Sequence, residues 1–97
     1  MERGFISMKH IESYINESIK DPENLPLYII DILNKLRIAD STGNSISYFD
    51  RIDDLCVIVK NSIVENLMTY EQWGVLKEKY WTYADAVFEK EFKNENG

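Results

Sequence analysis

Apolar residues recur every three or four positions over most of this chain, the spacing that places them on one side of an α-helix. Four such segments are separated by breaks that contain proline, glycine or short polar runs. We therefore predict an all-α fold, a small single-domain bundle of about four helices at residues 7–20, 26–39, 47–66 and 69–93.

The first two segments have clear boundaries. Asp21 and Pro22 end the first, because a proline disfavours the α conformation of the residue before it. Pro26 suits the first turn of the second helix, since its fixed φ is already helical. The polar run DSTGNS at residues 40–45 has the glycine and Asx residues of a loop. We expect the second helix to stop before it.

The third and fourth segments carry capping signals. Ser45 and Ser47 are both candidate caps of the third helix, and Ser47 with Asp50 three residues later resembles a capping box. Thr69 and Gln72 form the same pattern at the start of the fourth. The third helix is the most amphipathic, with an apolar stripe of Phe49, Ile52, Cys56, Val59 and Ile63.

The fourth segment is the aromatic one, with seven of the twelve aromatic residues between Tyr70 and Phe92. Its apolar residues form two stripes rather than one: Trp73, Leu76, Tyr80, Ala84 and Val87, and then Trp81, Phe88 and Phe92. Either neighbours cover this helix on two sides, or one stripe is exposed. An exposed stripe would be an interface, for a homodimer or for another protein.

Gly74 lies in the second turn of this aromatic helix, directly after Trp73. A glycine inside a helix costs about 1 kcal/mol relative to alanine. We expect close packing of another backbone or ring over this turn to explain it. A contact with a partner is the alternative.

The composition is that of an ordinary folded domain, with 44% apolar and 29% charged residues. The net charge of −6 argues against nucleic acid or an anionic membrane surface as a partner and favours a basic protein. No apolar run approaches the roughly 20 residues that span a bilayer. The N-terminal residues do not resemble a secretory signal, and the single cysteine agrees with a reducing compartment, so we expect a cytoplasmic protein.

Acidic residues concentrate in the middle of the chain, where residues 21–54 hold seven acids and three bases. Asp50, Asp53 and Asp54 are spaced i, i+3 and i+4, which places them on one side of the third helix near its start. They could complement the helix dipole, bind a divalent metal, or form a docking surface for a basic protein together with Asp40. Carboxylates elsewhere that would complete a metal site are not signalled by any motif.

Candidate catalytic residues are few. His10 is the only histidine and has no second ligand or oriented partner in the pattern. Cys56 falls on the apolar stripe of the third helix, where burial raises the pKa of a thiol and lowers its reactivity. Phosphate-binding loops, serine elbows and zinc motifs are missing from the sequence. We predict no enzyme, no cofactor and no metal.

These features predict a non-catalytic protein-binding module. The favoured hypothesis is a small acidic inhibitor of bacterial or phage type that neutralises a basic protein, as an immunity protein, an antitoxin or a nucleic-acid mimic does. The alternative is a structural or regulatory helical module that forms homo-oligomers through its aromatic helix. The residues predicted to bind protein are Asp40, Asp50, Asp53, Asp54, Trp81 and Phe88.

Overall fold

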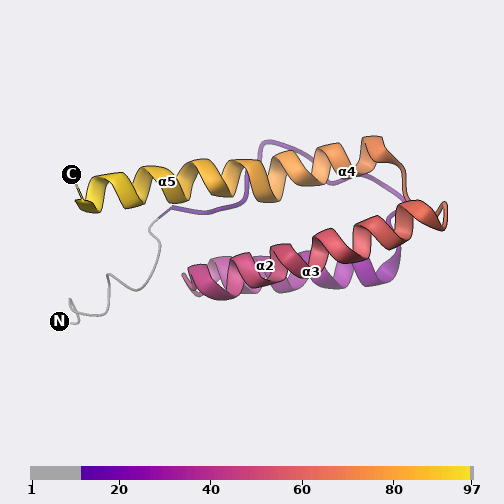
Figure 1. Cartoon of the computed structure of the whole chain (residues 1–97), viewed down its shortest axis with the longest axis horizontal. Helices are drawn as coiled ribbons and strands as arrows, with labels where there is room; N and C mark the ends of the chain where they lie inside the picture. Colours follow the sequence, from indigo (N-terminus) through magenta and orange to yellow (C-terminus); the bar gives the residue numbers. More distant parts are fainter. Residues whose placement is uncertain (1–11, 97) are drawn as a thin grey trace.

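The computed structural model describes residues 12–96, and all helices of this part of the chain lie from residue 27 onward, joined by short loops (Figure 1). Helix α2 (Leu27–Ser41) and helix α3 (Ser45–Val64) form an antiparallel hairpin. Helices α4 (Tyr70–Leu76), η1 (Lys77–Thr82) and α5 (Tyr83–Asn96) join end to end into one C-terminal helix, residues 70–96, that lies along the hairpin. The described residues contain no β-strand, so the all-α prediction is confirmed, with three helical rods instead of four.

The helix predicted at residues 7–20 is wrong for residues 12–20, which are not helical. Residues 7–11 lie outside the part of the chain that the structure describes. Residues 12–26 form an irregular segment, here called the strap, which runs along the C-terminal helix. Local polar side chains explain the difference: the Asn16 Oδ1 atom accepts hydrogen bonds from the Ser18 amide (3.0 Å) and hydroxyl (2.6 Å). Such bonds offer the backbone an alternative to the helix.

Helix α2 begins one residue after Pro26 and ends two residues later than predicted, at Ser41. Its end is a Schellman motif. Gly43 has φ of 76° and donates its N–H to the Asp40 carbonyl (3.0 Å), and the next amide, that of Asn44, donates to the Ala39 carbonyl (3.1 Å). Glycine adopts this left-handed conformation without strain, so the loop needs only residues 42–44.

Asn44 then caps helix α3, because its Oδ1 atom accepts the Ser47 N–H at 3.0 Å. The predicted caps, Ser45 and Ser47, both lie inside the helix, so that prediction is wrong. Asparagine caps as well as serine does, and the preceding turn already leaves Asn44 in an extended conformation. The predicted capping box of Thr69 and Gln72 is present at the start of α4.

One hydrophobic core joins all three rods and the strap. Helix α3 turns Tyr48, Ile52, Leu55, Val59 and Ser62 into the core, so of its predicted apolar stripe only Ile52 and Val59 are fully buried, while Phe49, Cys56 and Ile63 lie at the edge. The first stripe of the C-terminal helix is buried as predicted, apart from Trp73, which is only partly buried. Tyr14 and Ile15 of the strap are also buried. The core residues are Tyr14, Ile15, Ile29, Ile32, Leu33, Leu36, Ala39, Tyr48, Ile52, Leu55, Val59, Met68, Leu76, Tyr80, Ala84 and Val87.

Candidate functional site

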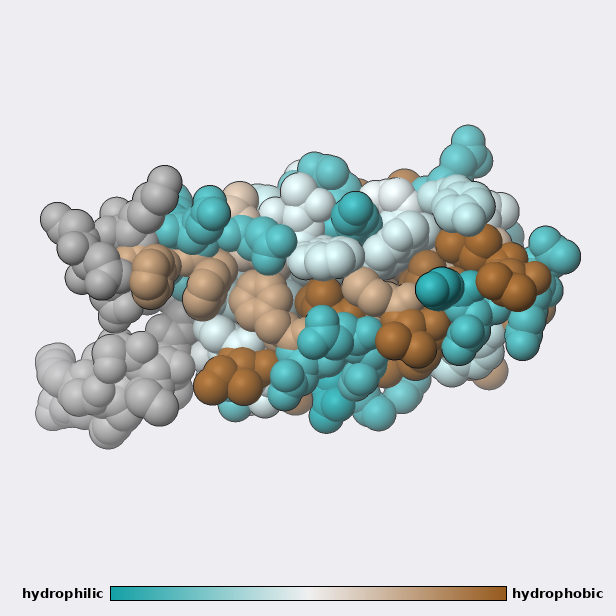
Figure 2. Space-filling view, in the orientation of Figure 1, coloured by the Kyte–Doolittle hydropathy of each residue, from teal (hydrophilic) through white to brown (hydrophobic). Residues whose placement is uncertain are grey.

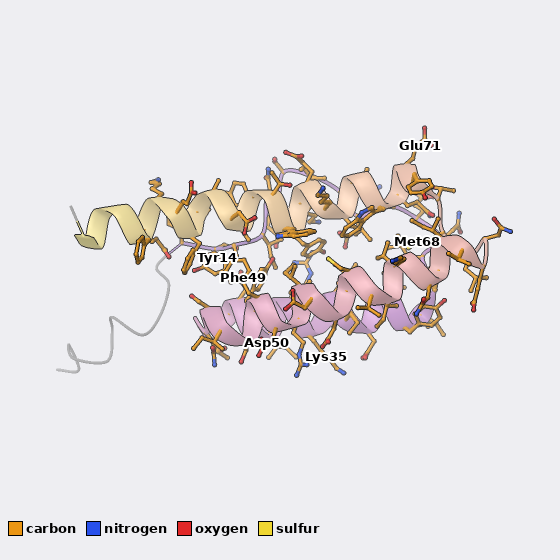
Figure 3. All side chains as sticks on the ribbon, viewed as in Figure 1. Tyr14, Lys35, Phe49, Asp50, Met68 and Glu71 are labelled. Atoms are coloured by element: carbon orange, nitrogen blue, oxygen red, sulfur yellow. The ribbon has the colours of Figure 1, made fainter. Side chains whose placement is uncertain are left out.

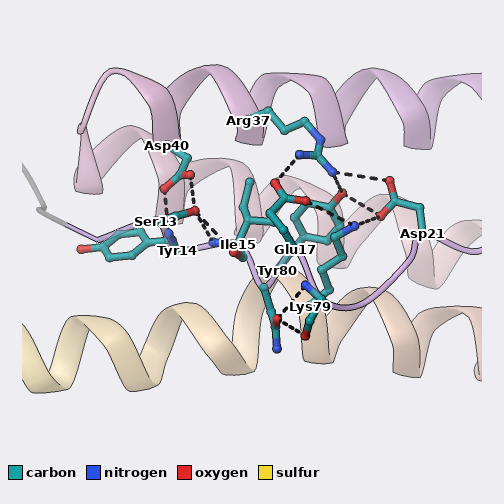
Figure 4. A network of polar contacts seen from close by, with 11 residues as sticks. Ser13, Tyr14, Ile15, Glu17, Asp21, Arg37, Asp40, Lys79 and Tyr80 are labelled. Carbon is teal, nitrogen blue, oxygen red and sulfur yellow. Dashed lines mark hydrogen bonds and ion pairs between the residues drawn. The ribbon is translucent and has the colours of Figure 1, made fainter.

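One flank of the C-terminal helix binds the strap through a network of charged groups (Figure 4). Asp21 of the strap accepts a hydrogen bond from the Tyr80 hydroxyl (2.8 Å) and lies 3.0 Å from the ammonium of Lys79. Glu17 pairs with the Arg37 guanidinium of α2 at 2.7 Å, and Arg37 also donates to the Tyr80 hydroxyl (3.0 Å). The strap therefore connects α2 to the C-terminal helix.

The π-helical turn η1 makes backbone carbonyls of the C-terminal helix available to the strap and to α3. The Tyr83 N–H bonds to the Glu78 carbonyl, five residues earlier, instead of to the carbonyl of Lys79. The Lys79 carbonyl accepts the Asn16 N–H of the strap at 3.0 Å. The next carbonyl, that of Tyr80, accepts the hydroxyl of Tyr48 from α3 at 2.6 Å.

The two tyrosine hydroxyls in and beside this network are hydrogen-bond donors that connect the rods and the strap. Burial raises the pKa of Tyr80, and its hydrogen bond to Asp21 raises it further. Burial also raises the pKa of Tyr48. Both hydroxyls therefore stay protonated and act as hydrogen-bond donors.

Sequence reasoning missed this network. One signal was available: Lys79 is three residues after Leu76 and directly before Tyr80, so a base falls beside the apolar stripe. Its side chain is only 4% exposed. A buried ammonium group needs an acidic partner from another part of the chain. The sequence pattern does not identify that partner as Asp21.

The four predicted acidic residues fall into two groups. Asp40 does not join the others on α3, because its two carboxylate oxygens accept the Ser13 hydroxyl (2.7 Å) and the Tyr14 N–H (2.8 Å) of the strap. Asp50, Asp53 and Asp54 are exposed on α3, and Asp54 pairs with Arg51 at 3.2 Å. Within the described residues, Asp50 and Asp53 have neither an ion pair nor a hydrogen bond.

The structure does not support the interpretation that Asp50, Asp53 and Asp54 stabilise the helix dipole of α3. It assumed that α3 starts at Ser47, which would put Asp50 in the first turn. With Asn44 as the cap, the first turn of α3 contains no acid, and Asp50 and Asp53 lie in the second and third turns. The dipole effect falls off within the first turn.

The other flank of the C-terminal helix carries the second aromatic stripe. Trp81 is partly buried, with its ring 6.3 Å from that of Trp73 and 5.4 Å from the Lys77 ammonium. Nearer the C-terminus, the rings of Phe49, Phe88 and Phe92 follow one another at 5.5 and 6.4 Å, and we call these three residues the aromatic strip. Figure 2 shows hydrophobic side chains along the seam between α3 and the C-terminal helix, with hydrophilic ones on both sides.

The aromatic strip is accessible, since Phe88 is 42% and Phe92 59% exposed. Acids flank it on both helices at the spacing of surface neighbours. Asp53 is four residues after Phe49, and Asp85 and Glu89 are three residues before Phe88 and Phe92 respectively. We call Asp53 on α3 and Asp85 and Glu89 on α5 the acidic rims. Asp50 directly follows Phe49 and points to another side of α3, away from the C-terminal helix (Figure 3).

The acidic rim on α5 is not neutralised within the described residues. Asp85 and Glu89 are exposed and pair with no base there. Slight burial raises the pKa of Asp85, and the neighbouring Glu89 carboxylate raises it further. Neither acid was among the predicted binding residues, although their i, i+3 spacing from Phe88 and Phe92 can be read from the sequence.

The sequence also singled out Cys56, Gly74 and His10. Cys56 is partly rather than fully buried, and burial raises the pKa of its thiol, as expected. A Cβ added to Gly74 would meet no atom within 4 Å, so the expected close packing is wrong. His10 lies outside the described residues.

Comparison with known proteins found no matching family model, no significantly similar curated protein and no significantly similar solved structure. Among residues 12–96 there is no group of three or more side chains that could hold a metal ion. The helices described in this structure are too short or too polar to cross a membrane.

Proposed function

We propose that this chain is a non-catalytic protein-binding module that binds a basic partner through the aromatic strip and its acidic rims. The supporting observation is a partly exposed aromatic surface flanked by acids of α3 and α5, Asp53, Asp85 and Glu89, that have no ion pair among the described residues. Exposed aromatic rings are common anchors of protein interfaces. Unpaired carboxylates around them favour a partner with lysine or arginine beside an apolar surface.

A basic amphipathic helix fits this description best. Its apolar side would contact Phe49, Phe88 and Phe92, while its bases on either side would reach the rims on α3 and α5. Binding of an amphipathic helix in an apolar groove is a recurring mode of peptide recognition. An acidic inhibitor of a basic toxin or nucleic-acid enzyme would use such a surface, and this remains the class that we favour.

The alternative, a homo-oligomer formed through the aromatic helix, is supported by the exposure of Phe88 and Phe92. A symmetric dimer through the strip would bring Asp85 and Glu89 of two copies close together. Like charges at an interface oppose association. We therefore rank homo-oligomerisation second, and sedimentation across a hundredfold range of concentration tests it directly.

The proposed function can be tested with a peptide that has leucines on one helical face and lysines on both sides of it. A peptide of the same composition in scrambled order is the control. We expect the ordered peptide to bind at least about tenfold more tightly, and Phe88→Ala to remove most of that difference, since anchor residues contribute more than 1 kcal/mol.

The rims are tested with matched charge changes. Asp53→Asn with Asp85→Asn removes two charges beside the strip. Glu65→Gln with Glu71→Gln removes two exposed charges near the opposite end of the molecule, where Glu71 is labelled in Figure 3. We expect only the first pair to weaken peptide binding at low salt and to reduce its salt dependence. Equal effects of both pairs would contradict a specific acidic surface.

A further inference from the structure

The seam between α3 and the C-terminal helix extends beyond the aromatic strip, and basic residues lie at its other end. On α3, Lys60 is eleven residues after Phe49, so about three helical turns bring it back to nearly the same side of the helix. On the C-terminal helix, the Lys77 ammonium lies 5.4 Å from the Trp81 ring. Burial raises the pKa of Cys56 and the charge of Lys77 opposes that rise, so this ammonium lies near α3.

Lys60 and Lys77 are bases that the described part of the chain leaves without an acid. Most of the other described bases pair with one: Lys35, Arg37, Arg51, Lys79 and Lys90. Among residues 12–92, Lys20, Lys60 and Lys77 have no such ion pair, and two of these three lie at the seam. Both are exposed, so their charges are accessible to an acid of another protein.

Apolar side chains connect the acidic end of the seam to the basic end (Figure 2). On the C-terminal helix, the rings of Trp81 and Trp73, 6.3 Å apart, continue beyond the aromatic strip. On α3, Ile63 is partly buried and Val64 is 75% exposed, both just beyond Lys60. A single helix laid along the seam would therefore stay on an apolar surface while it passes from acids to bases.

We propose that the partner segment is an amphipathic helix with charges of both signs: bases that meet the acidic rims, and an acid about two turns away that meets Lys60 and Lys77. This inference rests on the proposed function and narrows the class of partner. A uniformly basic helix would place like charges against the two lysines, which opposes association.

The spacing of the partner's charges follows from the spacing along the seam. Lys60 is seven residues after Asp53 on α3. Lys77 is eight residues before Asp85 on the C-terminal helix. At a rise of about 1.5 Å per residue, both helices separate their opposite charges by about 10–12 Å. A partner helix aligned with the seam needs about seven residues between its bases and its acid.

The test uses two synthetic peptides that share leucines along one helical face and lysines at one end. They differ about seven residues further along, where one peptide has glutamates and the other has glutamines. Each is made with its lysines at the N-terminal end and again at the C-terminal end, so that both directions of binding are covered. At low salt, we expect the native chain to bind the glutamate peptide at least about threefold more tightly in one of the two directions.

Glutamate also changes the helix content of a free peptide, so the preference must be traced to the two lysines. Lys60→Gln with Lys77→Gln should abolish it without weakening the binding of the glutamine peptide. Lys20→Gln with Lys35→Gln is the matched control and should retain the preference, since Lys20 is on the strap and Lys35 points away from the C-terminal helix (Figure 3).

The outcomes distinguish this inference from the proposed function. Equal binding of the two peptides by the native chain, or a preference that the Lys60 and Lys77 variant retains, would overturn the inference. The proposed function would stand in that case, provided that Phe88→Ala still weakens both peptides. Failure of every peptide to bind the native chain would overturn the proposed function and this inference together.

Discussion

The two flanks of the C-terminal helix use its residues in opposite ways. On the strap flank, Lys79 and Tyr80 are buried, and their charge and hydroxyl are matched within the chain by Asp21. On the other flank, Phe88 is partly exposed and the acids beside it have no described base. Both flanks combine aromatic and charged residues. Only on the strap flank are the charged groups paired with oppositely charged groups of the same chain. The flank with Phe88 and its unpaired acids is therefore the better candidate for binding a partner protein.

The largest expected effect is a difference in the free energy of unfolding between a variant of the strap flank and a variant of the aromatic flank. Tyr80→Ala removes a fully buried ring and a hydroxyl that bonds Asp21 and Arg37, so the free energy of unfolding should fall by about 3–5 kcal/mol. Phe88→Ala should cost about 1 kcal/mol or less, because its ring is already partly hydrated. Urea denaturation of both variants measures the difference, and similar losses would contradict the contrast.

The bond between α3 and the π-turn gives the next largest effect. Tyr48→Phe removes only the hydroxyl that donates to the Tyr80 carbonyl at 2.6 Å. We expect a loss of about 1–1.5 kcal/mol, the usual contribution of one hydrogen bond. Tyr83→Phe is a matched control on an exposed tyrosine of α5 and should be neutral in the same denaturation experiment.

Gly74 tests whether the aromatic flank of the C-terminal helix needs a glycine for stability or for binding. Gly74→Ala should raise the free energy of unfolding by about 0.5–1 kcal/mol, because alanine favours the helix and its Cβ meets open space. Thermal unfolding followed by circular dichroism measures this gain. A gain in stability together with weaker binding of the amphipathic peptide would place the partner over this turn.

Asp85 tests whether the charge of the α5 rim opposes folding, because partial burial and then the neighbouring Glu89 carboxylate disfavour its ionised form. Its pKa is raised in the folded chain, so the folded state holds its proton more tightly than the unfolded state does, and ionisation of Asp85 opposes folding at neutral pH. Asp85→Asn should therefore stabilise the protein slightly at pH 7. The gain should disappear below about pH 4, where the unfolded chain is also protonated. A gain that persists at pH 3 would point to a cause other than charge.

The smallest expected effect belongs to the acids on α3. Replacing Asp50, Asp53 and Asp54 with asparagine should change the free energy of unfolding by less than about 0.5 kcal/mol, since none lies in the first turn and their only ion pair is exposed. A loss of 1–2 kcal/mol in urea denaturation would restore a structural role for them. Stability that is unchanged, with slower association of a basic peptide, would support docking.

The candidate surface was partly visible in the sequence. Helical spacing alone predicts Phe88 and Asp53 as interface residues, and the structure packs Phe88 against Phe49, four residues before Asp53 in α3. Helical spacing also groups Asp50 with Asp53, but Asp50 points away from the C-terminal helix. Asp40 was selected for its charge, but its oxygens bind the strap. Charge patterns show which acids share a helix face, whereas the groups that neutralise them come from distant parts of the chain.

The sequence by itself determined the three helices from residue 27 onward. Their periodic apolar residues, the capping box of Thr69 and Gln72, and the loop glycine Gly43 act over a few residues, and such local signals do not depend on the rest of the fold. Only the tertiary structure decided the conformation of the strap. Its helix-like spacing competes with local side-chain bonds and with partners 20 to 79 residues away in the chain, including Arg37, Lys79 and Glu91. Those contacts exist only once the helices have packed.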